Sequence, residues 1–292
     1  MRIAVLIKQV PDSQAVRMDE STGILVRDPA DAVTNPLDLS ALTLALRVAG
    51  KVTCVSGEGK SATITAVGMG PKSAERSLRE ALALGADGAV LVCDRLCAGS
   101  DTLATSKLLA TTLKKLGPFD LVLCGLRATD GETGQVGPEI ASNLGIALAT
   151  YVESLEYIDD GRFEAVRRTE GATERIRFKT PALVSVTKGA GDPGLPTLER
   201  KKSSRRQGIQ VLSVADLGLE PGEAGLAGSP TRVAKIFHPA LARHGERIFA
   251  GVGDGMFQAV AALMKVMDDD FLQNQVPSTE NGADSWKGGQ GE

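Results

Sequence analysis

Short apolar runs alternate with helical patterns along the first half of the chain, and this alternation restricts the fold more than any other feature. Four runs have the length and composition of strands buried on both faces of a sheet: 3–7, 62–67, 89–93 and 121–124. Helical patterns follow these runs at 36–49, 71–84, 102–116 and 138–144. Strands and helices that alternate at this spacing form parallel sheets with helices on both faces. We therefore predict an α/β fold with a doubly wound, mostly parallel, Rossmann-like sheet of the adenine-nucleotide-binding kind.

The residues at the borders of these helices agree with this prediction. Asn35 and Pro36 provide an N-cap and a proline at the first helical position. Gly85 follows the second helix, where a C-cap residue is expected. After the first helix, we interpret residues 50–61 as a loop or a hairpin-like insertion.

Beyond Tyr151 the apolar period changes to two, which predicts an added β-hairpin region. The predicted strands are 152–158, 163–168 and 176–186, the last two joined around Glu170-Gly171. The later chain gives weaker signals, with a region rich in Gly and Pro at 189–230, a candidate strand at 231–237, a short helix at 257–267 and a polar tail at 272–292. We expect this tail to be mobile.

Composition excludes several classes of function. Lys and Arg number 33 against 36 Asp and Glu, and the resulting net charge of −3 argues against wholesale nucleic-acid binding. Aromatic residues make up only 3%, too few for a base-stacking platform, and two His with four Cys exclude a Cys/His-rich zinc architecture. We interpret the cysteines as buried free thiols, with a redox pair of Cys93 and Cys97 as the alternative.

No targeting or membrane-spanning segment is predicted. The first apolar run ends at Lys8, and no cleavage site follows it. No apolar run approaches the roughly 18 residues that a membrane-spanning helix needs. We expect a cytoplasmic protein.

Two glycine motifs give weak indications of a nucleotide. Gly57-Glu-Gly-Lys-Ser61 is interpreted as a surface turn, because Cys54 stands where a phosphate-binding P-loop requires glycine. Gly68-Met-Gly70 follows a strand and opens a helix. That arrangement suits either the close approach of a ligand or a tight turn between strand and helix.

The segment Gly125–Pro138 gives the strongest indication. It follows a predicted strand, at the edge where open α/β sheets bind their ligands. Its backbone N–H groups precede a helix, and a helix N-terminus carries unpaired donors and a positive dipole. Its glycines permit close approach. We favour a nucleotide-binding loop over a long capped loop.

Eight segments of the chain recur in one order in a known family: Ile7–Asp12, Asn35–Asp38, Gly68–Pro71, Ala81–Asp87, Gly125–Pro138, Lys179–Ala182, Leu195-Pro196 and Gly228–Val233. In this combination the chain resembles the β subunit of electron-transfer flavoproteins, the FixA-type family, over residues 1–240. The resemblance implies a heterodimer with an α subunit that carries an electron-transferring flavin. It also implies three parts: a nucleotide- or flavin-binding domain at 1–190, a partner-recognition loop and an extended C-terminal arm that contacts the α subunit at 191–240, and a short helix with a polar tail at 241–292.

Members of this family hold an adenine nucleotide in the β subunit. Simple members hold AMP as a structural ligand, whereas electron-bifurcating members hold a second FAD, to which NADH delivers a hydride. The contacts that the resemblance carries onto this chain are Ile7, Asn35, Pro36, Leu37, Asp38, Met69, Gly125, Leu126, Arg127, Ala128, Thr129, Asp130, Gly131, Glu132, Thr133, Gly134, Gln135 and Val136. Leu195 matches a loop that docks on an acyl-CoA dehydrogenase in family members.

The chain looks more like the bifurcating branch. Its segments 8–12, 129–133 and 228–233 are similar to that group, and Gly131 removes a carboxylate and its bulk beside a diphosphate. We therefore expect FAD in this subunit and NADH as a transient donor. The expected acceptors are an acyl-CoA dehydrogenase or a quinone-linked partner, together with ferredoxin. A simple electron shuttle with structural AMP is the alternative.

The resemblance also suggests roles within the loop. We expect Asp130 and Thr133 to position it and the amide groups of 133–137 to hold phosphate. Arg127 is expected either near the isoalloxazine or paired with a phosphate.

No side chain is expected to act as a general acid or base. His238 and His244 are assigned structural or surface roles. The basic run 199–206 is interpreted as a solvated face, or alternatively as a surface that steers an acidic partner. A nucleotide hydrolase on a related sheet is disfavoured, because Gln9–Ser13 stands where those enzymes have a Ser-Gly-Gly-x-Asp-Ser loop.

Overall fold

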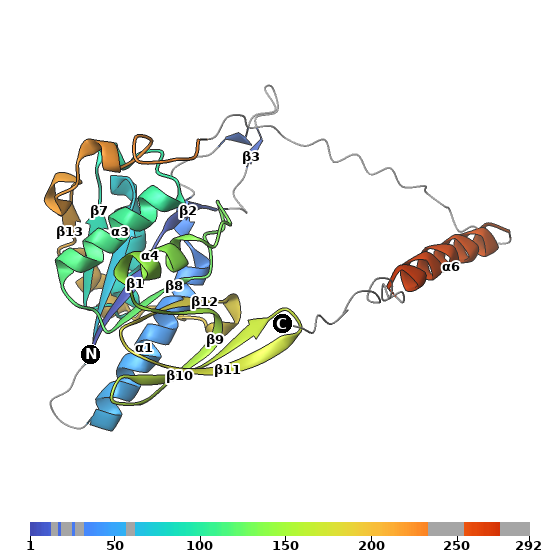
Figure 1. Ribbon diagram of the computed structural model, residues 1–292, viewed down its shortest axis with the longest axis horizontal. Coiled ribbons are helices and arrows are strands. Elements are labelled where there is room, and N and C mark those ends of the chain that lie inside the picture. The colour runs from blue at the N-terminus through green and yellow to red at the C-terminus, as the bar shows by residue number, and fades with distance from the viewer. Residues whose placement is uncertain (13–16, 19–24, 27–31, 57–61, 233–253, 275–292) are drawn as a thin grey trace, which may run out of the picture. The chain divides into compact units, whose positions relative to one another are not determined.

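The structure is a computed structural model that describes residues 1–12, 17–18, 25–26, 32–56, 62–232 and 254–274 of the chain. It divides into two compact units, Met1–Ala234 and Lys235–Glu292. The first unit is built on a nine-stranded sheet with the strand order β11-β10-β9-β12-β8-β1-β6-β7-β13 (Figure 1). In the second unit the described part is one helix, α6 (Asp254–Asn274).

The strands of the large sheet are β1 (Arg2–Leu6), β6 (Thr63–Met69), β7 (Gly88–Val92), β8 (Leu121–Gly125), β9 (Ala147–Asp159), β10 (Arg162–Thr169), β11 (Ala172–Lys179), β12 (Ala182–Val186) and β13 (Gln210–Leu212). In this strand order, every neighbouring pair between β9 and the edge strand β13 is parallel. Strand β10 pairs antiparallel with both β9 and β11. Two small antiparallel pairs lie between β1 and the first helix: β2 (Gln9–Pro11) with β5 (Ala32–Thr34), and β3 (Arg17–Met18) with β4 (Leu25–Val26).

Five α-helices accompany the sheet: α1 (Pro36–Ser56), α2 (Glu75–Leu84), α3 (Thr102–Leu116), α4 (Val136–Leu144) and α5 (Leu198–Arg206). Short 3-10 turns occur at Lys72–Ala74, Arg95–Cys97, Lys188–Ala190, Ala215–Leu217 and Pro221–Glu223. Within the described ranges, no helix has the length and apolar character needed to cross a membrane.

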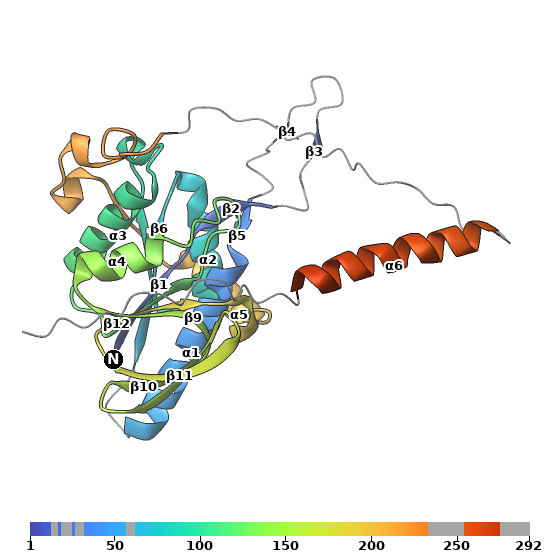
Figure 2. The same ribbon diagram turned by 45° about the vertical axis from the view of Figure 1, so that its right-hand side comes forward.

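Strand β1 shows how the two faces of the sheet are buried. Ile3 and Val5 pack in a cluster with apolar residues of α1 and α2, whereas Ala4 and Leu6 pack with residues of α3 and α4. Successive side chains of a strand point to opposite faces, so a continuous apolar run fits a strand covered on both sides. Figure 2 shows α3 and α4 on one side of β1 and α1 and α2 on the other. The predicted doubly wound, mostly parallel α/β fold is confirmed.

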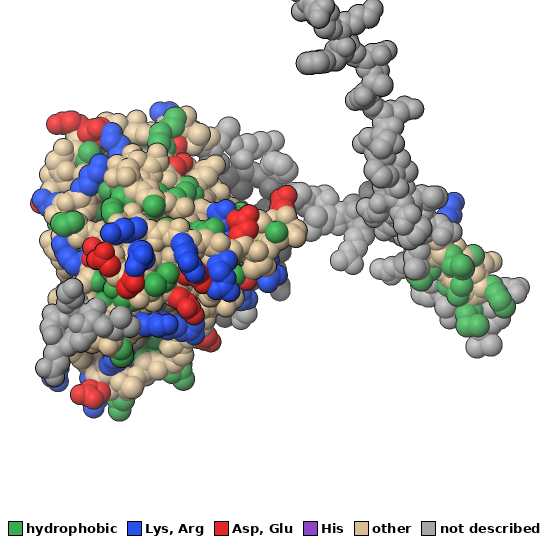
Figure 3. All heavy atoms as spheres, turned by 60° about the horizontal axis from the view of Figure 1, so that its bottom comes forward, with side chains coloured by type: hydrophobic (Ala, Val, Ile, Leu, Met, Phe, Trp, Pro, Cys, Tyr) green, Lys and Arg blue, Asp and Glu red, His purple; other side chains and the backbone are tan. Residues whose placement is uncertain are grey.

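The antiparallel strands β9–β11 form the added hairpin region. Its inner face holds a stacked aromatic pair, Phe163 with Phe178, and Tyr157 meets Phe163 edge-on. On its charged face, Glu164 pairs with both Arg175 and Arg177. Figure 3 brings the β10–β11 side forward and shows Lys and Arg side chains interspersed with Asp and Glu.

Two sequence predictions about element borders were wrong. Residues 50–56 continue α1, rather than form a loop, because Val48 and Val52 extend its buried face. The predicted strand 176–186 is two strands: β11 ends at Lys179, and β12 returns to the parallel part of the sheet. Pro181 separates them, since proline cannot donate a hydrogen bond to a sheet ladder.

Smaller differences occur towards the C-terminus. The basic run lies on a helix, α5, within a region predicted as a loop, and the strand β13 follows it. The helix predicted at 257–267 extends over Asp254–Asn274, so it includes the start of the predicted tail. Thr231 and Arg232 form no strand, and the rest of the candidate strand at 231–237, residues 57–61, His238 and His244 lie outside the described residues.

Candidate functional site

The chain reverses its direction across the sheet between β1 and β8. From β1 it passes through α1 to β6 and through α2 to β7, whereas α3 leads back to β8 on the other side of β1. Open α/β sheets bind ligands outside the carboxyl ends of the strands at such a reversal. Loop 126–135 leaves β8 at this point, and β1 runs towards the same edge from the end marked N in Figure 1. The predicted nucleotide loop therefore lies at the reversal point.

Asp38 joins the two strand ends at this point. One of its carboxylate oxygens accepts a hydrogen bond from the backbone N–H of Lys8 (2.8 Å), and the other accepts one from Gly125 (2.9 Å). The side chain is only 5% exposed. Asp38, which was predicted to contact the nucleotide, therefore links the ends of β1 and β8 through these two hydrogen bonds.

Asn35 ties the start of α1 to the loop. Its backbone N–H donates to Lys8 O (2.9 Å), and its Nδ2 donates to Arg127 O (3.0 Å). Its backbone carbonyl accepts bonds from Asp38 and Leu39, in the first turn of the helix, as expected of the residue before Pro36. Asn35 Oδ1 is buried and, within the described residues, accepts no hydrogen bond. An unpaired buried acceptor is costly, so this atom suits a donor group on a ligand.

Two ion pairs hold the exposed part of the loop. Lys8 Nζ lies 2.8 Å from Asp130 Oδ1, and Arg127 Nε lies 3.9 Å from Glu132 Oε1. All four side chains are at least 31% exposed, so the pairs contribute little to stability. They place two cations beside loop 126–135, where the anionic groups of a nucleotide would lie.

The backbone of the loop offers unpaired donors. The N–H of Glu132 donates to Ala128 O, but within the described residues the N–H groups of Thr133, Gly134 and Gln135 donate no hydrogen bond. Glu132 and Gly134 have φ values of 52° and 64°, which turn the chain sharply before α4 begins at Val136. Successive free N–H groups before a helix form a concavity that binds anions.

Gln135 is held from the side by α3. Thr102 Oγ1 lies 3.1 Å from Gln135 Oε1 and 3.2 Å from Glu139 Oε1, within hydrogen-bonding distance of both. Because one hydroxyl donates one proton, it serves one of these oxygens at a time. Thr102 therefore links the end of the loop to the first turn of α4.

The remaining predicted contacts lie at the same edge, with one exception. Ile7 is buried and donates its N–H to Val67 O, and Met69 ends β6 and packs among the core residues beneath α3. Leu37 lies half-buried against Gly125, and Pro36 is exposed. Leu195 lies apart, in the exposed stretch before α5, and is 96% exposed.

Sequence reasoning missed Lys8 and Thr102 as parts of this site. Lys8 directly follows the first strand, so the rule that ligands bind at carboxyl ends could have identified it. Thr102 gave no such signal, because its contact with Gln135 depends on how α3 and α4 pack.

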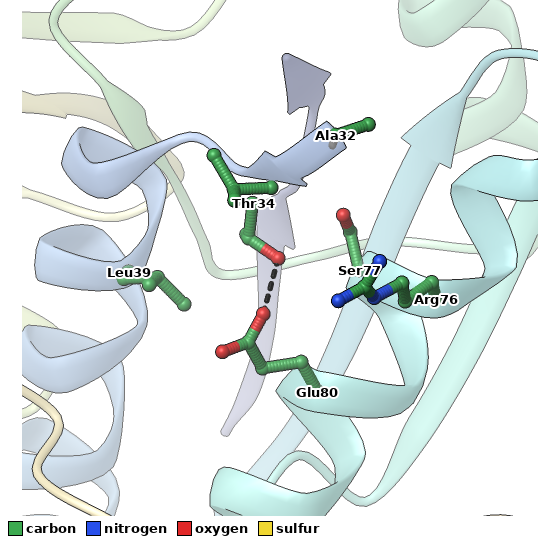
Figure 4. A pocket seen from close by; sticks show the side chains of 7 residues that line it. Ala32, Thr34, Leu39, Arg76, Ser77 and Glu80 are labelled. Atoms are coloured by element: carbon green, nitrogen blue, oxygen red, sulfur yellow. Dashed lines mark hydrogen bonds between the residues drawn. The ribbon is translucent and has the colours of Figure 1, made fainter. Parts of the chain in front are cut away.

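A partly open cavity of about 190 Å³ lies between β5 and α2 (Figure 4). Thr34 Oγ1 donates to Glu80 across it, and Leu39, Arg76 and Ser77 line it. Small-molecule pockets usually measure about 300–1,000 Å³. The cavity is therefore too small for a dinucleotide, and the strand ends at Asp38 with loop 126–135 are the better candidate.

The residues at the carboxyl ends of β1 and β8 fit an adenine nucleotide. The free N–H groups of the loop and the cations Lys8 and Arg127 suit phosphate groups, and Asn35 Oδ1 suits a hydrogen-bond donor of the nucleotide. Gly131 has no atom within 4 Å of the position of a Cβ, so the loop is open at that point.

Asp38 predicts an unusual pH dependence of stability. Burial raises the pKa of its carboxyl to about 7, although the N–H donors of Lys8 and Gly125 act in the opposite direction. An unfolded Asp has a pKa of about 3.9, so the folded state binds the proton more tightly. The stabilisation that this proton provides is complete below about pH 4 and is lost as the pH rises to about 7. Over that range the free energy of unfolding falls by at most about 1.4 kcal/mol per pH unit. Urea unfolding of wild type and Asp38→Asn between pH 4.5 and pH 7.5 should show this difference in slope; parallel curves would contradict it.

Comparisons with known proteins agree with this geometry. Residues 22–217 match the family model described as the electron transfer flavoprotein domain. The chain is 42% identical over 252 residues to the electron transfer flavoprotein subunit beta of Thermoanaerobacterium thermosaccharolyticum, covering 86% of this chain and 93% of that protein. It is 38% identical to the caffeyl-CoA reductase-Etf complex subunit CarD of Acetobacterium woodii, covering 85% and 92%, and 37% identical to Protein FixA of Azotobacter vinelandii, covering 91% and 94%.

Proposed function

Because this chain belongs to the electron transfer flavoprotein family, as a β subunit of the FixA type, we propose that it binds FAD at the carboxyl ends of β1 and β8, beside loop 126–135. β subunits of this family pair with an α subunit. In that heterodimer, the proposed activity is NADH-dependent electron bifurcation. The proposed acceptors are ferredoxin and an acyl-CoA dehydrogenase or a quinone-linked partner, and the proposed setting is the cytoplasm.

The loop 126–135 is the observation that carries this proposal. The free N–H groups of Thr133, Gly134 and Gln135 and the dipole of α4 would hold the diphosphate of FAD. Arg127 and Lys8 would add positive charge beside it. A bound flavin supplies the redox chemistry, by accepting a hydride and passing electrons on. The side chains of this chain bind and orient the flavin, and none is assigned a proton-transfer role.

Gly131 supports FAD over AMP. The space beside it is open, and residue 131 itself adds no carboxylate that would repel a second phosphate. The alternative is a simple electron shuttle in which the β subunit holds structural AMP. Asn35 and the loop amides would serve either ligand, because AMP and the ADP half of FAD share the same groups.

The content of nucleotides in the heterodimer tests the proposal. The chain is expressed with its α subunit, the complex is denatured, and the released FAD and AMP are counted. Two molecules of FAD and none of AMP per heterodimer are expected. One molecule of each would overturn the proposal in favour of the alternative.

The variant Thr133→Pro tests where the nucleotide lies. Proline lacks the N–H group, and a hydrogen bond to a charged group contributes about 1.5–3 kcal/mol, so nucleotide binding should weaken roughly tenfold to a hundredfold. Thr133→Ala keeps the N–H group and is the matched control. Because Thr133 is exposed, Thr133→Ala should unfold at the same urea concentration as the wild type. Urea unfolding of Thr133→Pro measures separately what proline costs by disfavouring the φ of 52° at Glu132. Full nucleotide content in Thr133→Pro would show that this amide does not hold phosphate.

A further inference from the structure

Residues 221–231, here called the connector, come after β13 and are tied to the N-terminal end of α3. Figures 1 and 2 both show this part of the chain beside α3. The N–H of Gly225 donates to Ser100 Oγ (3.2 Å), in the turn that leads into the helix. The N–H of Leu226 donates to Ala98 O (3.2 Å) in the same turn. The connector is therefore hydrogen-bonded to the chain just before α3, although more than 100 residues separate the two in sequence.

Asp101 serves both α3 and the connector. One of its carboxylate oxygens caps α3 by accepting from the N–H of Ala104 (3.0 Å), and the other accepts from the N–H (3.1 Å) and the hydroxyl (2.8 Å) of Thr231. Its own N–H donates to Ser229 Oγ (2.9 Å), and Ser229 is buried. The Ala104 N–H and then the donors of Thr231 hold the pKa of Asp101 below its ordinary value, so the carboxyl is ionised at neutral pH. The position of Thr231 and that of the start of α3 therefore depend on each other.

Thr102, the next residue, is the first residue of α3, and its side chain reaches the nucleotide loop. Its Oγ1 lies 3.1 Å from Gln135 Oε1 and 3.2 Å from Glu139 Oε1. Gln135 ends loop 126–135, and its N–H is one of the donors that we assign to phosphate. Because Asp101 and Thr102 are adjacent, a shift of the start of α3 alters both sets of contacts together.

The groups around Thr102 leave room for a bound nucleotide to change this arrangement. Within the described residues, the N–H groups of 133–135 donate no hydrogen bond and Glu139 Oε2, which is buried, accepts none. Unpaired buried groups are costly. A phosphate that accepts from the loop would fix Gln135 and, through it, the hydroxyl of Thr102. A contact that is already fixed costs less conformational entropy when the next one forms, and this effect couples two sites without a large movement.

We propose that Asp101 and Thr102 are positioning residues that couple the nucleotide loop to the connector. A bound nucleotide holds the connector more firmly on α3, and a connector seated on α3 strengthens nucleotide binding by the same factor, because such coupling is reciprocal. The second unit follows the connector in the chain, so an occupied site would fix the point from which the chain continues to that unit. This inference rests on the part of the proposed function that places a nucleotide at loop 126–135.

Hydrogen exchange tests the first direction, in the αβ heterodimer depleted of nucleotide and then supplied with FAD or with AMP. Nucleotide should slow exchange of the amides in residues 225–231 about threefold to tenfold. Thr102→Val, which removes the hydroxyl but keeps the shape of the side chain, should abolish this slowing, and Thr102→Ser should restore it. The matched control is Thr111→Val, because the hydroxyl of Thr111 donates to Lys107 O within α3 (2.8 Å). It should behave as the wild type does.

Nucleotide affinity tests the reverse direction. Thr231→Val removes one hydrogen bond to Asp101, away from the nucleotide loop, yet it should raise the dissociation constant of the nucleotide about threefold to tenfold. The double variant Thr102→Val/Thr231→Val should bind no more weakly than Thr102→Val alone, because both substitutions break the same link. If the two effects multiplied in the double variant, the residues would act independently and the proposal would fail.

Two further results would overturn the coupling: equal exchange at 225–231 with and without nucleotide, and loss of the nucleotide effect in Thr111→Val. A purely structural role of Thr102 would lower the urea midpoint of Thr102→Val but leave the slowing by nucleotide in place. The proposed function fails separately. A heterodimer that holds AMP and still shows slowed exchange would refute FAD and keep the coupling, whereas two molecules of FAD with unchanged exchange would refute the coupling alone. A heterodimer that binds neither nucleotide would refute both.

Discussion

Asp38→Ala is expected to lower the free energy of unfolding by about 2–4 kcal/mol and to strip the nucleotide from the heterodimer. The substitution leaves the buried N–H groups of Lys8 and Gly125 without an acceptor, and each unpaired group costs about 1–3 kcal/mol. The substitution also removes the cost of burying the carboxyl group. The expected loss of stability is therefore smaller than the highest combined cost of the two unpaired N–H groups. Nucleotide binding should fail because the loop after β8 loses its fixed position relative to the end of β1.

Asp120→Ala is the matched control for this experiment. Asp120 accepts a hydrogen bond from the backbone N–H of Arg2 (2.7 Å), at the opposite ends of the same two strands and in a more exposed place. Its removal should cost about 0.5–1.5 kcal/mol and leave nucleotide content unchanged. Urea unfolding and a count of released nucleotide measure both effects. Equal losses in the two variants would show that Asp38 has no special role at the reversal point.

The layers of the fold were predictable because each buried strand can be recognised from its own residues. Five consecutive apolar residues at 3–7 require cover on both faces, and the observed packing of Ile3 and Ala4 against opposite helix layers is the direct consequence. The start of α1 at Asn35-Pro36 was predictable for the same reason, since an N-cap residue and a proline act within a single helical turn.

Helix ends were less predictable than helix starts. Gly50 suggested an end for α1, yet the helix continues because Val52 is buried against the core. Glycine costs only about 1 kcal/mol in a helix interior, and a buried valine outweighs that amount. The break at Pro181 was missed because strand-like sequence continues after it, so that the sequence does not reveal the change of strand partner from β10 to β8.

The position of the candidate site was predictable, but its internal contacts were not. The rule that ligands bind at the carboxyl ends of strands located the loop at 125–138. The ion pair of Lys8 with Asp130 joins residues 122 positions apart, and no local pattern encodes such a contact. The hydrogen bonds that Asp38 accepts from Lys8 and Gly125 are also non-local, and no sequence pattern predicts them.

Gly125→Ala is expected to destabilise the fold by about 1–3 kcal/mol and to lower nucleotide content, although it adds only one methyl group. A Cβ at this position would lie 2.5 Å from Asp38 Oδ1 and 2.7 Å from Leu37 Cβ. It would also lie 2.9 Å from the backbone carbonyl carbon of Leu37, which cannot move without shifting the first turn of α1. Glycine is therefore required here because the first turn of α1 packs closely against the end of β8, not because the backbone adopts a positive φ.

Gly131→Ala provides the comparison, because a Cβ there meets no atom within 4 Å. Its free energy of unfolding should stay within about 0.5 kcal/mol of the wild type. If Gly125→Ala proved equally harmless, α1 and the end of β8 would have to be able to move apart, and Asp38 could not then hold the strand ends at fixed positions. The pair of alanine variants thus separates two needs for glycine within a single loop, close packing beneath the site at Gly125 and open space at its mouth at Gly131.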